Sequence, residues 1–147
     1  MAAMLDATRV LVGVASRSLE QLGEEVTVAQ FRLLLVLREA GPSASVEVAS
    51  RLGSAGSSVT RLADRLEETG HLTRRRERPN RSVVRLELTR AGGELVDRVL
   101  SWRHAELARI VGELPAGVAE TIEHGMRVFV EVAGVGYGAG PIELQIR

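Results

Sequence analysis

The sequence predicts a mainly α-helical protein with one β-hairpin near its middle. Apolar residues recur at three- and four-residue spacing through most of the 147 residues, as they do along the buried face of a helix. Between residues 72 and 88 the spacing changes to alternation, which is typical of half-buried strands. Hydrophobic residues make up 45% of the chain, and a chain of this length buries roughly 70% of its unfolded surface. We therefore expect a single globular domain, or one domain with helical extensions.

The first expected helix covers residues 1–22. Its apolar positions are spaced more like a coiled-coil seam than like the buried face of a monomer helix; they are Leu5, Val12, Ala15, Leu19 and Leu22. This seam predicts a partner helix. Gly23 ends the helix, and Thr27 with Gln30 forms a capping box for the next one, because the hydroxyl and the amide satisfy exposed backbone N–H groups.

The second helix is apolar on almost every side between residues 31 and 37. We expect it to be covered on more than one side and to form the centre of the core. A Gly-Pro pair ends this helix. Ser43 or Ser45 is then expected to cap a short helix over residues 46–52.

A turn at residues 53–56 leads into a helix over residues 57–69. One face of that helix is apolar and consists of Val59, Leu62, Ala63 and Leu66. Two helices joined by a short glycine-containing turn are the signature of a helix-turn-helix. Strands over residues 72–76 and 83–88 then form a two-stranded hairpin with an arginine-rich tip.

Two helices are expected after the hairpin. Thr89 starts one that runs to about residue 114, and Pro115 separates it from a last helix that ends at about residue 132. The apolar face of the last helix consists of Val118, Ile122, Met126, Phe129 and Ala133. The glycine-rich tail from Gly134 is expected to be mobile.

The composition excludes several classes of protein. The chain has no cysteine, and all 19 of its basic side chains are arginine, so thiolate nucleophiles, zinc ribbons, Walker-type phosphate loops and Schiff-base lysines are absent. Aromatic residues make up only 3%, too few for a platform that stacks single-stranded nucleic acid. The apolar stretches at 10–15 and 128–139 are too short or too interrupted for a membrane span of about 20 residues, and we expect a cytoplasmic protein.

The charge is unevenly distributed although the formal net charge is zero. Residues 51–90 hold ten arginines against five acidic residues, a net charge of +5, and the rest of the chain is acidic by the same amount. The basic charge therefore lies on the helix-turn-helix and the hairpin. This asymmetry is what a module that meets phosphates on one face requires.

Each basic element has an expected DNA contact. Ser57 and Ser58 lie at a helix N-terminus, where free N–H groups and the helix dipole favour a phosphate. One turn further along, Thr60, Arg61 and Arg65 can point into a major groove, where an arginine fork pairs with guanine. The hairpin contributes further arginines toward the backbone or minor groove: Arg74, Arg76, Arg78 and Arg81. Side chains alternate along a strand, so at most two of Arg74, Arg75 and Arg76 can face DNA together; one of the three can pair with Glu77 or Glu87.

Three segments carry a family resemblance: VTVAQFRLLLVLREAGPSASVEVASRLG, SSVTRLADRLEETGHLTRRR and VVRLELTRAG. They are similar to the MarR family of bacterial winged-helix transcription regulators. The resemblance implies a homodimer held by residues 1–25 and 115–147, a winged helix-turn-helix DNA-binding lobe over residues 26–90, and a long connecting helix over residues 89–114. Because proteins of the MarR family also carry N- and C-terminal helices, the resemblance extends over essentially the whole chain.

The resemblance also implies a function. It implies a repressor that binds a pseudo-palindromic double-stranded operator with half-sites roughly 10 bp apart. A small aromatic or lipophilic ligand, held between the dimerisation helices and the DNA-binding lobe, would release it. The wing departs from the family pattern, which has Asp and Arg where this chain has Asn80 and Ser82, with the arginine displaced to Arg81. This departure predicts a shifted turn or an altered groove contact.

Other functions have less support in the sequence. His71, His104 and His124 have no partner at the spacing of a metal site, and no serine lies in a nucleophile elbow, so we expect no metal, no cofactor and no enzyme activity. The alternative is a winged-helix module that uses the same helix and hairpin to bind a protein, without sequence-specific DNA binding. Duplex affinity that falls steeply with salt separates the two.

Overall fold

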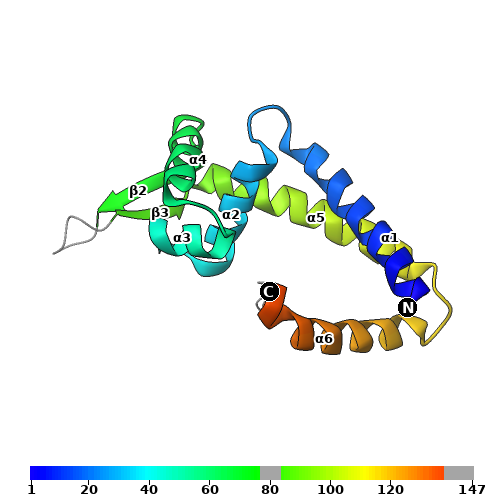
Figure 1. Cartoon of the computed structure of the whole chain (residues 1–147). Helices are drawn as coiled ribbons and strands as arrows, with labels where there is room; N and C mark the ends of the chain where they lie inside the picture. Colours follow the sequence, from blue (N-terminus) through cyan, green and yellow to red (C-terminus); the bar gives the residue numbers. More distant parts are fainter. Residues whose placement is uncertain (77–83, 138–147) are drawn as a thin grey trace. The chain divides into compact units, whose positions relative to one another are not determined.

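The computed structural model describes residues 1–76 and 84–137, and the side chains up to residue 133. Its elements are α1 (Ala2–Ser18), the 3-10 turn η1 (Leu19–Leu22), α2 (Val28–Ala40), β1 (Ser43–Ala44), α3 (Ser45–Leu52), α4 (Gly56–Glu68), β2 (Leu72–Arg76), β3 (Val84–Leu88), α5 (Arg90–Gly112) and α6 (Val118–Tyr137) (Figure 1). The chain divides into two compact units, residues 1–104 and 105–147. The prediction of a mainly helical fold with a hairpin is confirmed.

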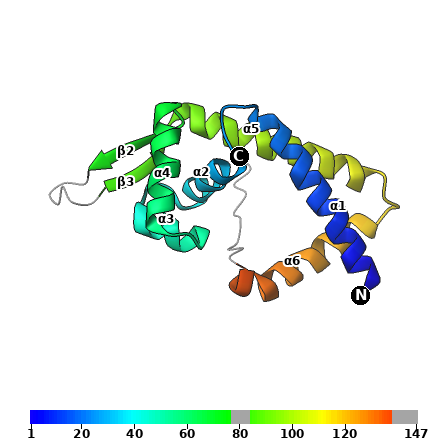
Figure 2. The same cartoon turned by 45° about the horizontal axis from the view of Figure 1, so that its top comes forward.

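The hairpin is part of a three-stranded antiparallel sheet rather than an isolated pair. The strand order is β1-β3-β2, and Leu86 of β3 lies between Ser43 of β1 and Arg74 of β2. Figure 2 shows β2 and β3 extending away from the helices of the lobe. Sequence periodicity did not predict β1, which adds a short third strand at the base of the β2–β3 hairpin. This hairpin is called the wing below.

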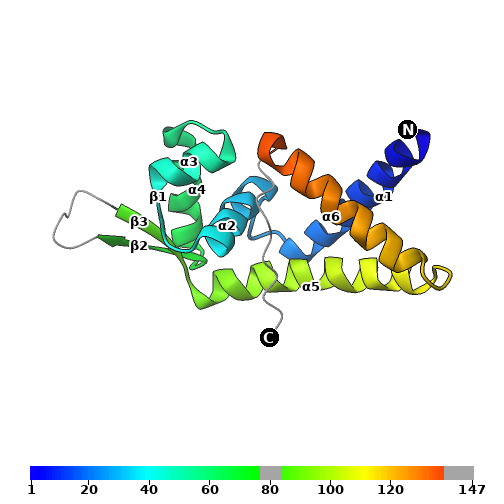
Figure 3. The same ribbon diagram turned by 90° about the horizontal axis from the view of Figure 1, so that it is seen from below.

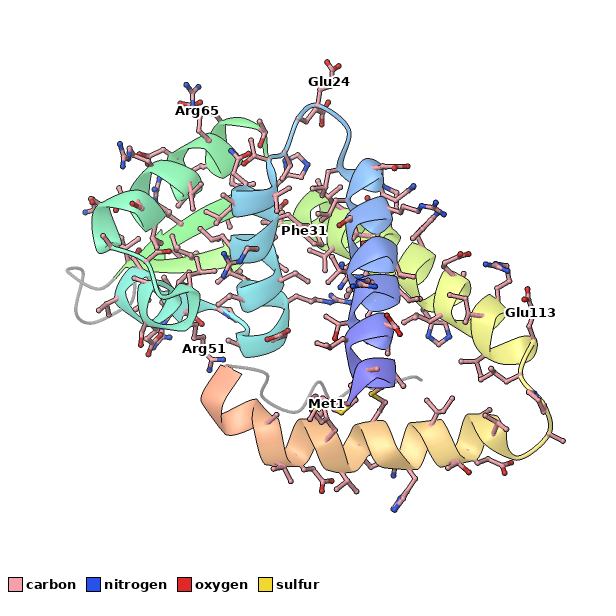
Figure 4. The ribbon with its side chains drawn as sticks, turned by 45° about the vertical axis from the view of Figure 1, so that its right-hand side comes forward. Met1, Glu24, Phe31, Arg51, Arg65 and Glu113 are labelled. Carbon is pink, nitrogen blue, oxygen red and sulfur yellow. The ribbon has the colours of Figure 1, made fainter. Side chains whose placement is uncertain are left out.

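The core of the first unit is built around α2, as predicted. Phe31, Leu33 and Leu34 of α2 are at most 1% exposed, and Phe31 is labelled in Figure 4. Around them lie fully buried side chains of α4, the wing strands and α5: Val59, Ala63, Leu66, Leu86, Val96 and Val99. Each buried leucine or phenylalanine side chain contributes about 1.5–3 kcal/mol, so this cluster fixes the positions of α4 and the hairpin.

The helix caps agree with the sequence at one site and differ at another. The capping box of α2 is confirmed. The backbone N–H of Gln30 donates to the Thr27 hydroxyl oxygen at 3.3 Å, and the backbone N–H of Thr27 donates to the Gln30 side-chain oxygen at 2.7 Å. The predicted serine cap of α3 is wrong, because Ser43 belongs to β1 and its hydroxyl donates to the Gly41 carbonyl. Instead, the Glu47 carboxylate accepts from the Ala44 amide at 2.7 Å.

The N-terminal helix is divided between the core and the surface. Leu22 is buried, whereas Leu5 and Val12 are 62% and 57% exposed. The Arg103 guanidinium of α5 donates to the buried Ser18 hydroxyl at 2.9 Å and 3.2 Å, which joins α1 to α5 within the first unit. Burial lowers the pKa of Arg103. Only the first part of the predicted seam is therefore available to a partner helix.

The second unit contains the end of α5 and the last helix (Figure 3). The predicted break at Pro115 is confirmed, but α6 continues to Tyr137, so the helix ends later than predicted and Gly134 lies inside it. The expected mobile tail beyond residue 137 lies outside the described residues. Three apolar side chains of the predicted face are exposed, at 42% for Ile122, 42% for Met126 and 51% for Phe129. Among the helices described, none is long and apolar enough to cross a membrane.

Candidate nucleic-acid interface

The N-terminus of α4 offers backbone donors at the surface. The helix begins at Gly56, and its N-cap, Ala55, has no side chain that could satisfy the first amides. Ser57 is exposed and Ser58 is half-buried, while the Thr60 hydroxyl donates back to the Gly56 carbonyl at 3.0 Å. The Ser57 hydroxyl and the first amides of the helix can therefore meet a phosphate, as the sequence predicts.

The two arginines on the outer face of α4 differ in their partners. Arg65 is exposed and pairs with Glu68 at 3.0 Å (Figure 4). Arg61 is also exposed, and the described part of the chain gives it no ion-pair partner. An exposed ion pair is worth little, so Arg65 can be released from it. Arg61 needs no such release to reach a base edge.

Arg74 is held between the wing and α4. Its side chain is 26% exposed, and its guanidinium contacts Asp64 at 2.6 Å and Glu67 at 2.5 Å. Burial by itself lowers the pKa of Arg74, but the hydrogen bonds and charges of the two carboxylates outweigh it and raise the pKa above its ordinary value. The sequence placed Arg74 among the DNA contacts; in the structure its guanidinium ties β2 to two carboxylates of α4.

The strand register separates the wing arginines as alternation predicts. Arg75 lies directly opposite Arg85 on β3, and it pairs with Glu87 at 2.7 Å. The sequence left Glu77 and Glu87 open as partners for one of the three consecutive arginines, and the structure pairs Arg75 with Glu87. Arg76 is exposed and two residues from Arg74, so these two side chains leave the strand on the same side.

The wing tip lies outside the described residues. Arg78 and Arg81, the candidate contacts, and the departure at Asn80 and Ser82 all fall within residues 77–83. The described interface therefore consists of the outer face of α4 and the strand ends next to it.

Comparison with known proteins identifies the architecture. A family model described as "MarR family" matches residues 25–81, which hold α2, the helix-turn-helix and β2. The solved structure of RV1404 from Mycobacterium tuberculosis is 31% identical, covers 90% of both chains and superposes with a TM-score of 0.81. A MarR family protein from Bacillus stearothermophilus is 26% identical over 88% of this chain and 92% of its own, with a TM-score of 0.76. The chain belongs to the MarR family.

A curated relative in the family is a transcriptional repressor. The HTH-type transcriptional repressor MdtR of Bacillus subtilis is 36% identical over 97 residues. The match covers 66% of this chain and 61% of MdtR. The chain therefore spans about three-fifths of the length of that curated relative. The curated homologues that the chain matches are transcriptional regulators and not enzymes.

One joint of this MarR-family lobe was not predicted from the sequence. The Thr89 hydroxyl donates to the Gly70 carbonyl at 2.6 Å and accepts from the Gly92 amide at 3.1 Å. The same hydroxyl thus caps α5 and holds it against the end of α4. A threonine directly before a helix is a capping signal, but its second partner depends on tertiary structure.

The buried histidine of the lobe has a structural role. Nδ1 of His71 lies 2.9 Å from the Thr69 hydroxyl, and the His71 carbonyl accepts from the Thr89 amide at 3.2 Å. No cluster of three possible metal ligands exists among the residues that the structure describes. Trp102 is half-buried on α5.

The role of Arg74 can be tested by comparison with its neighbour. Arg74→Gln is expected to lower the free energy of unfolding by about 1 kcal/mol, because Asp64 and Glu67 lose the cation that they share. The Arg74 side chain is only partly exposed, so its ion pairs should contribute more than fully exposed ones, and high salt should screen them and reduce the loss. Arg75→Gln, whose side chain is 75% exposed, is expected to change it by less than about 0.5 kcal/mol. Urea denaturation at low and high salt measures the free energy of unfolding of both variants. Equal losses would show that the ion pairs between Arg74 and α4 stabilise the chain no more than the exposed ion pair of Arg75.

Proposed function

We propose that the chain is a homodimeric transcriptional repressor that binds double-stranded DNA. The observation that carries the proposal is the exposed outer face of α4, where Arg61 has no ion-pair partner within the described residues and lies beside a helix N-terminus with free amides. In this reading Thr60, Arg61 and Arg65 lie in the major groove. Ser57 and Ser58 contact phosphate.

The wing supplies the remaining contacts. Arg76 is exposed at the end of β2, and with Arg78 and Arg81 of the tip it would reach the adjacent backbone or minor groove. Arg74 acts indirectly, because its bridge to Asp64 and Glu67 sets the angle between the wing and α4. The repressor function of MdtR supports assigning repression rather than activation.

The proposed organisation places recognition and dimerisation in different segments. Residues 26–90 form the DNA-binding lobe, residues 89–114 form the connecting helix, and residues 1–25 with 115–147 form the dimer. The exposed apolar side chains along α1, and separately along α6, support this assignment, because large exposed apolar surfaces mark interaction sites. A two-fold dimer would read a pseudo-palindromic operator in the cytoplasm, and a small aromatic or lipophilic ligand would release it.

Fluorescence anisotropy of a duplex from the region upstream of the chain's own gene tests the proposal. Specific binding should exceed binding to a scrambled duplex, and log K should fall linearly with log salt, at about −0.9 per phosphate neutralised. Weak binding to both duplexes with a flat salt dependence would instead favour a winged-helix module that binds a protein.

Arg61→Ala tests base reading within that assay. The substitution should weaken binding to the specific duplex by about 1–3 kcal/mol and leave binding to the scrambled duplex nearly unchanged. Arg32→Ala, on the exposed side of α2, is the matched control and should change neither. Equal losses on the two duplexes would mean that Arg61 contacts phosphate rather than bases.

A further inference from the structure

The two halves of α4 differ in charge. Residues 56–62 hold three hydroxyl side chains and one arginine, Arg61, and no carboxylate. The second half of the helix holds all three of its carboxylates: Asp64, Glu67 and Glu68. A carboxylate beside a duplex is repelled by the phosphates. The first half of α4 is therefore the part best suited to close contact with bases.

The cations beside the second half of α4 are already engaged. Arg65 donates to Glu68 at 3.0 Å (Figure 4), and Asp64 and Glu67 share the guanidinium of Arg74 from β2. If Arg65 turned to a base, it would leave the Glu68 carboxylate unpaired beside the duplex. The ion pair with Glu68 thus limits the base preference that Arg65 can add.

Arg61 can use its whole guanidinium fork for a base. It is exposed and has no ion-pair partner within residues 1–76 and 84–133. It lies on the side of α4 away from the buried Val59, Ala63 and Leu66. Guanine presents two acceptors in the major groove, N7 and O6, which match the two donors of the fork, whereas adenine presents one acceptor beside a donor. Arg61 therefore favours guanine.

Thr60 is exposed beside Arg61 and offers a methyl group rather than a donor. Its hydroxyl donates to the Gly56 carbonyl at 3.0 Å, so the hydroxyl hydrogen is used within the helix. While this bond holds, Thr60 cannot donate to the acceptors of a purine. Thymine carries the one methyl group among the bases of the major groove, and a threonine methyl packs against it. Thr60 therefore favours thymine.

We propose that α4 reads one guanine with Arg61 and one thymine with Thr60 in each operator half-site, and that Arg65, held by Glu68, adds no base preference of its own. The two bases lie within about two base pairs of each other, because adjacent Cα atoms are about 3.8 Å apart and base pairs stack about 3.4 Å apart. The inference rests on the function proposed above and names the bases that this function recognises.

Selection of bound sequences from a random duplex library tests the assignment. The parent chain should enrich a core that contains both bases. Arg61→Ala should lose the guanine preference and keep the thymine preference. Thr60→Ser, which keeps the hydroxyl and lacks the methyl group, should do the reverse, whereas Thr60→Val keeps the methyl group and should keep the thymine preference. Arg32→Ala, on the exposed side of α2, should enrich the parental core.

Base analogues in the selected duplex test the same contacts atom by atom. Deoxyuridine in place of the thymine removes only the methyl group and should weaken the parent chain about fourfold, the effect of one buried methyl group, without weakening Thr60→Ser. 7-Deazaguanine in place of the guanine removes N7 and should weaken the parent chain about tenfold, without weakening Arg61→Ala. Fluorescence anisotropy measures each affinity at one salt concentration.

The outcomes separate this inference from the function on which it rests. A library in which no sequence is enriched would contradict the proposed function and, with it, the base assignment. A selected core whose preferences survive in both Arg61→Ala and Thr60→Ser would leave the function standing and overturn the assignment. Loss of a second guanine preference in Arg65→Ala would also overturn it, because Arg65 would then read a base despite its ion pair with Glu68.

Discussion

Replacing Ile122 and Phe129 by glutamate is expected to leave a folded monomer that binds a two-half-site operator about 100-fold or more weakly than the parent chain. Both side chains are exposed on one face of α6, at 42% and 51%, so the substitutions bury no charge within the unit. In a dimer they would place four carboxylates in an apolar interface, where desolvation of an unpaired charge is strongly unfavourable. The second half-site would then no longer bind as an intramolecular event, and avidity of this kind contributes roughly 10²–10⁴.

Sedimentation velocity and anisotropy measure the two consequences. His124→Glu adds a carboxylate to another exposed side of the same helix, and it should remain dimeric with operator affinity close to that of the parent. Leu5→Glu with Val12→Glu tests the exposed part of α1 in the same way. Deletion of residues 1–22 is a poorer test, because Leu22 and Ser18 are buried in the first unit. A dimer of unchanged mass in the α6 double variant would exclude α6 from the interface.

The sequence predicted those parts of the lobe that depend on local signals. The capping box at Thr27 and Gln30 and the apolar face of α4 arise from residues three or four apart, and the structure has both. The sequence predicted only that one of Arg74, Arg75 and Arg76 can pair with Glu77 or Glu87; the structure pairs Arg75 with Glu87, which lies on the same face of the hairpin. For the candidate site, local spacing was enough to place Arg61 and Arg65 on the outer face of α4.

The sequence did not predict contacts that join distant segments. β1 has only two residues and no periodicity of its own, because it forms by pairing with β3 about forty residues later. Its formation removed Ser43 from the predicted helix cap. Likewise, strand alternation predicted on which face of the hairpin Arg74 lies, but it did not predict that α4 covers that face. Asp64 and Glu67, three residues apart on α4, were the available signal for its partners.

Gly92→Ala is expected to lower the free energy of unfolding by about 2–3 kcal/mol, although alanine is the better helix former by about 1 kcal/mol. Gly92 lies in the first turn of α5, where that helix meets the chain just after the end of α4. A Cβ atom there would lie 2.0 Å from the His71 carbonyl oxygen and 3.0 Å from its carbon. These are backbone atoms, and the same carbonyl accepts from the Thr89 amide, so relief requires the whole joint to shift.

The adjacent glycine provides the control for this steric argument. Gly93 is in the same helical turn, and the nearest atom to its Cβ position is a flexible Arg38 nitrogen at 4.0 Å. Gly93→Ala should therefore stabilise the chain, by up to about 1 kcal/mol. Urea denaturation at one protein concentration, followed by circular dichroism, compares the two variants. A loss of stability in Gly92→Ala together with a gain in Gly93→Ala would show that the close approach of α5 to His71 requires glycine at position 92. A gain in both variants would show that α5 can move away from His71 without cost. Because that joint sets the end of α4 relative to the wing, a destabilised Gly92→Ala chain should also lose more specific than non-specific duplex affinity.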